Sequence, residues 1–241
     1  MREAVASRRR LIAAIVAVAV VLAAAAWGAT YTSLFSARHV RVHGLRVLTP
    51  EEVRALAQIS PATNVAHLDA AAIRSRLVSS PWIADADVET DLPDTVVVTV
   101  RERQPVGVID AMGERSILAS DGTDLPLDGA PPPGLPLVRA ALGSPGDGQR
   151  AAAAALLSAL DPVVFARVAN VQVGQDEGLS LTLRSGAQVR AGLPGAEVEK
   201  ADTLRAILRW ASERHVDLTS IDISTPTAPS VRLADGSTVS P

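Results

Sequence analysis

The 241-residue chain contains no cysteine. It therefore has no disulfide, no thiol nucleophile and no thiolate ligand for a metal ion. Aromatic residues make up only 2% of the sequence. We expect the hydrophobic cores to consist of valine, leucine, isoleucine and alanine, and little aromatic surface is left for stacking on sugars.

Charged residues are missing from one long stretch, residues 11–37. Residues 11–31 are the most apolar part, and as a helix they extend about 31 Å, close to the thickness of a bilayer core. We predict a transmembrane helix over residues 11–31, with these residues as the membrane anchor: Leu11, Ile15, Val18, Leu22, Trp27 and Tyr31. A cleaved signal peptide is the alternative, but the apolar part of a signal peptide usually spans only about 7–15 residues.

The sequence Arg8-Arg9-Arg10 precedes this stretch. The positive-inside rule predicts a cytoplasmic tail at residues 1–10 and export of the remaining chain. Four of the 23 basic residues and one of the 26 acidic residues lie in this tail, so the exported part carries a net charge of −6. That balance argues against binding to nucleic acid.

Residues 37–105 show a β-α-α-β-β pattern. Residues 38–43 alternate polar and apolar side chains, as a half-buried strand does. Thr49 and Glu52 form a capping-box signature for a helix that Pro61 ends, and Asp69 can cap a second helix. Residues 84–89 and 95–100 predict two further strands. We expect a three-stranded sheet with two helices on one face, an α+β layer.

Residues 106–235 predict a second, β-rich domain with flanking helices. Short strand patterns recur between turn signals, and residues 149–160 and 197–213 predict helices. The last strands, around Ile221 and residues 230–233, close the predicted sheet with no later element long enough to cover them. Residues 236–241 are expected to be a C-terminal tail.

Several motifs resemble one family. Val40-x-Val42-x-Gly44, Pro81-Trp82-Ile83, Leu92-Pro93-x-Thr95 and Glu102-Arg103-x-Pro105 are similar to the POTRA domain of the FtsQ/DivIB cell-division proteins. Gly122-x-x-Leu125-Pro126, Leu135-Pro136-Leu137-Val138 and Ser220-Ile221-Asp222-Ile223 resemble the second domain of that family. The resemblance extends over about residues 34–233. It departs at Ser224, where the family often has an arginine.

Other candidate sites are weaker. His39 and His43 have the spacing of a helical metal pair, but on a strand this spacing only places them on one outward face. Asp85, Asp87 and Glu89 form an acidic row that fits a solvated edge. No P-loop, nucleophile elbow or dinucleotide fingerprint occurs. We therefore expect no catalysis, no cofactor and no metal site.

We expect partner binding at the end of the second sheet, because an edge strand can accept an extended segment as one more strand. Two prolines, Pro226 and Pro229, offer the opposing interpretation that this edge is blunted. The resemblance implies an FtsB-type coiled-coil partner, complexed with FtsL, and the septal wall-synthesis complex as a further partner. It also implies contacts from Lys200, taken as one of several exposed helix charges, and from these residues: Ile223, Ser224, Thr225, Pro226, Thr227, Ala228, Pro229, Ser230, Val231, Arg232 and Leu233.

The resemblance thus implies a non-catalytic divisome scaffold in the inner (cytoplasmic) membrane, with one span, a cytoplasmic N-terminus and an extracytoplasmic bulk at the septum. One alternative is an anchored POTRA-containing envelope chaperone or secretion accessory. A membrane-anchored wall enzyme is the third interpretation, and no sequence motif supports it.

Overall fold

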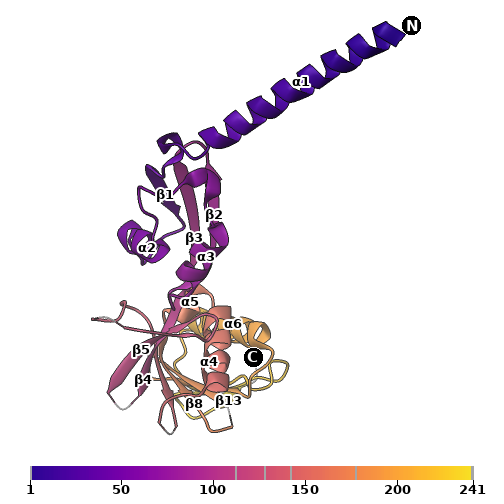
Figure 1. The fold of residues 1–241 in the computed structure, drawn as a ribbon. Coiled ribbons are helices and arrows are strands. Elements are labelled where there is room, and N and C mark those ends of the chain that lie inside the picture. The colour runs from indigo at the N-terminus through magenta and orange to yellow at the C-terminus, as the bar shows by residue number, and fades with distance from the viewer. Residues whose placement is uncertain (1, 112, 128, 142, 177, 240–241) are drawn as a thin grey trace. The chain divides into compact units, whose positions relative to one another are not determined.

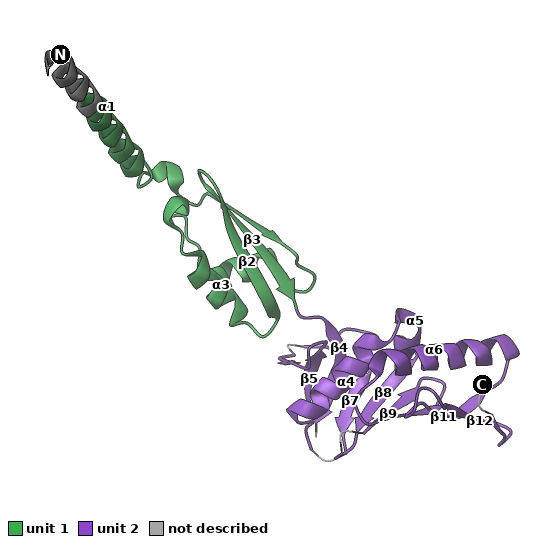
Figure 2. Ribbon diagram, turned by 90° about the vertical axis from the view of Figure 1, so that its right-hand side faces the viewer, with its two compact units in different colours: residues 1–102 green, residues 103–241 purple. Residues whose placement is uncertain are grey.

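A computed structural model describes the backbone of residues 2–111, 113–127, 129–141, 143–176 and 178–239, and side chains from residue 14 onward. The chain forms two compact units, residues 1–102 and 103–241, shown in green and purple in Figure 2. Each unit has its own hydrophobic core.

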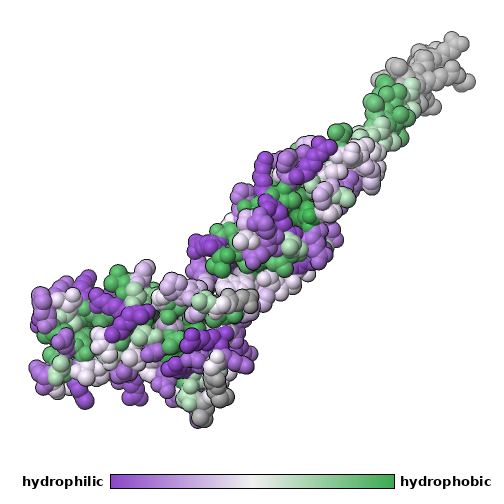
Figure 3. Space-filling model, turned by 90° about the vertical axis from the view of Figure 1, so that its left-hand side faces the viewer, coloured by the Kyte–Doolittle hydropathy of each residue, from purple (hydrophilic) through white to green (hydrophobic). Residues whose placement is uncertain are grey.

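The chain begins with helix α1 (Arg2–Ala29), labelled in Figure 1. Ile15, Val18, Leu22 and Trp27 on this helix, and Tyr31 just after it, are 60–64% exposed. Figure 3 shows hydrophobic surface, in green, on the described part of α1. Leu11 lies outside the residues whose side chains are described. Within the described residues, no helix combines the length and the apolar character needed to cross a membrane.

Hydrogen bonds and ring contacts join the end of α1 to the rest of the first unit. Asn64 Nδ2 donates to the Thr30 carbonyl at 2.7 Å, and Thr30 Oγ1 lies 2.9 Å from Nε2 of His67. The ring of Tyr31 stacks on His67 with centroids 4.2 Å apart. His67 ends a short 3₁₀ helix, η2 (Val65–His67), and a second one, η1 (Ser33–Phe35), follows Tyr31.

The first unit has the predicted β-α-α-β-β order. Its elements are β1 (His39–His43), α2 (Pro50–Ala57), α3 (Ala70–Val78), β2 (Ile83–Asp91) and β3 (Thr95–Glu102). The sheet order is β1-β3-β2, with β1 parallel and β2 antiparallel to β3. The capping box of Thr49 and Glu52 is confirmed, but α2 ends at Ala57, where Gln58 turns left-handed (φ 52°), rather than at Pro61.

Two motif residues shape the turn after β1. Gly44 has φ +86°, and a Cβ there would meet the Val100 carbonyl oxygen at 2.0 Å. The Glu102 carboxylate accepts the backbone N–H groups of Arg46, Val47 and Leu48 at 3.1, 2.8 and 3.0 Å. Gly44 and Glu102 therefore fix the path of residues 44–48 toward α2.

The second unit is built on a ten-stranded sheet in the order β13-β12-β11-β10-β9-β8-β7-β4-β5-β6. Its strands and helices are β4 (Pro105–Ala111), β5 (Glu114–Ala119), β6 (Asp124–Leu125), β7 (Leu137–Ala140), α4 (Asp147–Ala159), α5 (Pro162–Phe165), β8 (Val168–Val173), β9 (Leu179–Leu183), β10 (Gln188–Gly192), α6 (Glu197–Arg214), β11 (Leu218–Asp222), β12 (Ser230–Leu233) and β13 (Thr238–Val239).

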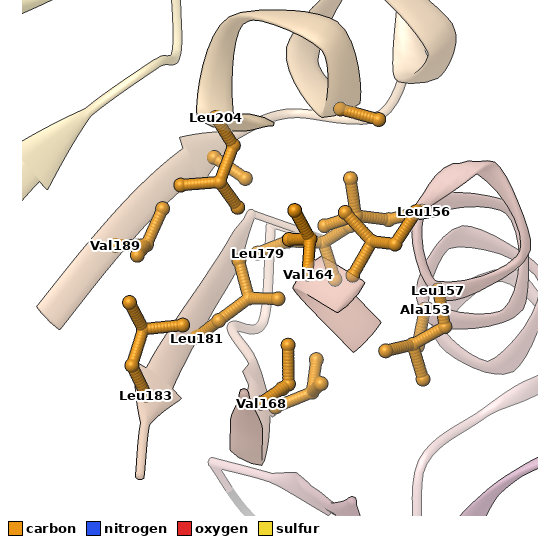
Figure 4. Close-up of a cluster of buried hydrophobic side chains, with 14 of the residues drawn as sticks. Ala153, Leu156, Leu157, Val164, Val168, Leu179, Leu181, Leu183, Val189 and Leu204 are labelled. Atoms are coloured by element: carbon orange, nitrogen blue, oxygen red, sulfur yellow. The ribbon is translucent and has the colours of Figure 1, made fainter. Parts of the chain in front are cut away.

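Aliphatic side chains form the core of this unit, in line with the low aromatic content. Figure 4 shows part of this cluster, which includes Leu156 and Leu157 of α4, Leu204 of α6, Leu181 of β9 and Val189 of β10. These five residues are at most 1% exposed. Each such burial contributes about 1.5–3 kcal/mol. The core thereby fixes α4 and α6 against one face of the sheet.

Candidate partner-binding site

The end of the second sheet is formed by four strands, β10 to β13. Parallel pairing of β10 with β11 places Arg190 opposite Asp222, and antiparallel pairing of β11 with β12 places Asp222 opposite Ser230. β13 then pairs antiparallel with β12, with Arg232 opposite Thr238. The prediction that no later element covers β12 is therefore wrong, and residues 238–239 of the expected tail form a strand.

A tight turn accounts for β13. Asp235 Oδ1 accepts the backbone N–H and the hydroxyl of Ser237 at 2.8 and 2.7 Å, and Gly236 has φ +87°. Those hydrogen bonds, the hydroxyl's first, lower the pKa of Asp235. The Leu233 N–H donates to the Ser237 carbonyl at 2.9 Å. Asp-Gly is a strong hairpin signal, so the sequence contained a clue to this turn.

Two of the predicted contact residues belong to the core. Ile223 and Val231 are both 0% exposed and lie in the cluster that includes Leu204 of α6. The Ile223 N–H also donates to the Arg190 carbonyl at 2.9 Å. Ile223 and Val231 therefore expose no side-chain surface to a partner in this fold.

The opposite face of the same strands is polar. A depression of about 220 Å³ lies there, lined by Gln188, Arg190, Ser220, Ile221, Asp222, Ser230, Arg232 and Thr238. Burial raises the pKa of Asp222, but hydrogen bonds from the Ser224 hydroxyl and amide and the charge of Arg190 outweigh it and lower the pKa overall. The carboxylate of Asp222 is thus stabilised in its ionised form beside Arg190.

The loop between β11 and β12 supplies most of the exposed residues. Ser224, Thr225, Thr227 and Ala228 are exposed. The Ala228 N–H donates to the Thr225 carbonyl at 3.0 Å, which closes a turn. Pro226 and Pro229 are half-buried in this loop and precede β12. Neither proline lies within a strand, and Pro229 directly precedes the first residue of β12.

Lys200 is not an exposed helix charge, and that expectation is wrong. Its side chain is only 3% exposed. Its ammonium group donates to the Leu193 carbonyl and lies 3.6 Å from Glu197 Oε2. Glu197 Oε1 accepts the Gly195 N–H at 2.6 Å. Lys200 and Glu197 therefore hold the loop between β10 and α6, and Lys200 acts on this surface by supporting it.

Two apolar side chains on this supported segment are exposed, although the helical pattern places Val198 on the apolar side of α6 with Leu204. Leu193 and Val198 are 60% and 62% exposed. The segment adjoins the β11–β12 loop, because a Cβ on Gly192 would lie 2.7 Å from the Cβ of Ser224. The strand–turn–helix sequence around Gly192-Leu-Pro-Gly195 was the available signal. The site thus combines apolar and polar surface beside β12.

The first unit contains the other sequence candidates. His39 and His43 are exposed at the two ends of β1, with their side chains on one face of the sheet. In the acidic row, Asp85 bonds Arg74 at 2.6 Å, while Asp87 and Glu89 are exposed. The hydrogen bond from Arg74 is the main cause that lowers the pKa of Asp85. Both sets lie on strands of the first sheet, β1-β3-β2, and not on the strands β10 to β13 that form the end of the second sheet.

Comparison with known families agrees with the two units. Residues 35–103 match the model described as "POTRA domain, FtsQ-type", and residues 106–224 match "Cell division protein FtsQ/DivIB, C-terminal". The second match ends at Ser224, so β12 and β13 lie beyond it.

Relatives carry the same family name. The chain is 30% identical to the cell division protein FtsQ of Mycobacteroides abscessus over 84% of its own length and 63% of that protein, just under two thirds. It is 31% identical to FtsQ of Streptomyces bingchenggensis over 93% of its own length and 86% of that protein. The extracytoplasmic domain of DivIB from Geobacillus stearothermophilus aligns with a TM-score of 0.35 and 14% identity, covering 46% of this chain and 92% of that domain. The chain belongs to the FtsQ/DivIB family of cell division proteins.

Proposed function

We propose that this chain is a non-catalytic scaffold of the division machinery that is anchored in the cytoplasmic membrane and recruits FtsB- and FtsL-type partners for septum formation. The single observation that supports it most is the end of the second sheet, where a polar face, an exposed loop and a very short terminal strand lie together. Anchoring two binding units in one membrane raises the effective concentration of weakly bound partners.

The anchor is proposed to be residues 11–31, with the N-terminus in the cytoplasm. Support comes from the described part of α1, where Val16, Val20 and Val21 are 55–66% exposed together with the anchor residues named above. A helix that is hydrophobic on all sides fits the interior of a large protein or a bilayer. The absence of charged residues from 11 to 37 agrees with the bilayer.

The partner site is proposed to comprise the exposed residues of the β11–β12 loop, Ser230 and Arg232 of β12, and the half-buried Leu233. Among the described residues, β13 pairs with β12 at residues 231 and 232, so the strand that a partner would have to displace is short. An extended segment of the FtsB-type partner would pair with β12 and displace β13. A pairing of two residues is a small barrier, since each hydrogen bond contributes about 0.5–1.5 kcal/mol net.

A capture experiment with the purified full chain tests this site. Arg232→Glu should reduce capture of the FtsB–FtsL-type complex, because Arg232 is exposed on β12. The control is Arg209→Glu on α6, whose side chain is 77% exposed and lies outside the strands β10 to β13. Equal capture by the wild-type protein and by Arg232→Glu would reject the site.

Truncation after Ala234 removes β13 and tests the displacement. If a partner strand replaces β13, the truncated chain should bind about fivefold more tightly, the equivalent of roughly one hydrogen bond. Weaker binding by the truncated chain would show that the partner adds to β13 instead.

Depletion in cells distinguishes the scaffold from an envelope chaperone. Filamentous, undivided cells with a normally folded set of envelope proteins are the expected result. Misfolded envelope proteins accumulating in cells that still divide would favour the chaperone, and turnover of wall substrates by the purified chain would favour an enzyme.

A further inference from the structure

The outer edge of β1 in the first unit offers backbone groups for pairing. The His39 N–H donates toward β3, to the Asp94 carbonyl at 3.2 Å. Backbone groups of a strand alternate in direction, so those of Val40 and Val42 point away from β3. Arg54 of α2 confirms this direction, because its Nη2 reaches the Val40 carbonyl at 3.4 Å.

A groove of about 500 Å³ runs along this edge. Val40, Ile59 and Pro61 give it an apolar lining, and Arg38, Arg41 and Arg54 add three guanidinium groups. Of the described residues that line it, none is acidic. The groove therefore offers a strand edge and concentrated positive charge in the same place.

Contacts outside the groove hold the three arginines in position. Arg54 bonds Glu51 at 3.0 Å, Arg41 lies 3.7 Å from Asp91, and Arg38 Nη2 donates to the Ser33 carbonyl at 3.4 Å. Each guanidinium has five N–H donors, so these contacts leave donors for a ligand. Planar guanidinium groups bind carboxylates in two-pronged pairs.

We propose that this groove binds an extended, acidic segment of a partner protein as an added strand on β1, with its carboxylates at Arg38, Arg41 and Arg54. An incoming backbone N–H would take over the Val40 carbonyl from Arg54. Arg54 would then be released to bind a carboxylate of the same segment. The site is distinct from the end of the second sheet and does not depend on the function proposed for it.

The full chain in detergent, with a fluorescent nine-residue peptide that alternates threonine and glutamate, tests the proposal. Saturable binding is expected, with amide chemical-shift changes at Val40 and Val42. Arg41→Gln and Arg54→Gln should each weaken binding about two- to fivefold, the range of a partly exposed ion pair. Arg101→Gln on β3, whose side chain is 72% exposed, is the control and should leave binding unchanged.

Changes in the peptide test the two components without altering the protein. Replacing glutamate by glutamine should weaken binding through charge, and methylating alternate backbone nitrogens should weaken it through strand pairing. Absent binding, equal binding of the glutamine peptide, or shift changes confined to β2 would overturn the proposal. The proposal would also be overturned if binding to phosphatidylglycerol vesicles depended on Arg54 while binding to the acidic peptide did not. The groove would then bind an anionic lipid surface.

Discussion

Lys200→Met is the substitution that most sharply tests how the partner surface is supported. Methionine keeps the length of the side chain but removes the charge, so it leaves Glu197 without its cation. Glu197 is 15% exposed at its side chain, and its Oε2 has no other hydrogen-bond partner in the described structure. Breaking a buried pair by removing one member costs about 3–5 kcal/mol.

The lower end of that range, about 3 kcal/mol, is expected here. Glu197 Oε1 still accepts the Gly195 N–H, which leaves part of the carboxylate solvated by the protein. The double variant Lys200→Met with Glu197→Gln removes both charges. It should recover most of the lost stability, because a neutral pair has no uncompensated charge.

Hydrogen exchange of the full chain in urea measures both effects, at the amides of residues 195–208 on the loop and α6. Arg209→Met is the matched control on the same helix and should change stability by less than about 0.5 kcal/mol. Two results would show that this pair does not hold the loop. Either Lys200→Met lowers the free energy of unfolding no more than the control does, or the double variant lowers it as much as the single variant.

Three further outcomes are expected. Glu102→Gln should destabilise the first unit by about 1–2 kcal/mol because it weakens three charge-assisted hydrogen bonds, and faster hydrogen exchange at residues 46–48 would show it. Gly44→Ala should cost about 3 kcal/mol or more through backbone strain and contact with Val100, and an unchanged melting temperature would refute the turn geometry. Because the pKa of Asp222 is lowered in the folded state, its ionised carboxylate stabilises the fold fully above about pH 4, and this contribution is lost as the pH falls further. Asp222→Asn should therefore flatten the acid limb of a stability–pH curve. An identical limb would contradict the hydrogen bonds from Ser224.

The first unit was predictable because its signals are local. The capping box of Thr49 and Glu52 and the Asp69 cap lie within four residues of the groups they bond. Residues 95–100 have valine at four of six positions, and β-branched residues of this kind strongly favour a strand. Local signals of this kind fix element type and order without knowledge of the tertiary fold.

The second unit was less predictable because its decisive contacts are tertiary. Lys200 lies on an amphipathic helix, and its burial is explained by the Leu193 carbonyl of the folded loop together with the Glu197 carboxylate. β13 has two residues, too few for an alternating pattern, so Asp235-Gly236 alone hinted at it. Val231 is buried because it pairs with Ile221 in the register between β11 and β12, and this register cannot be deduced from the sequence alone.

Photo-crosslinking in dividing cells tests the central claim most directly. A benzoylphenylalanine at position 232, on the exposed side of β12, should give an adduct with the FtsB-type coiled-coil partner, whereas the same group at position 209 on α6 should give none. An adduct at position 209 but not at 232, in cells that the variant chain still allows to divide, would contradict the proposed partner site.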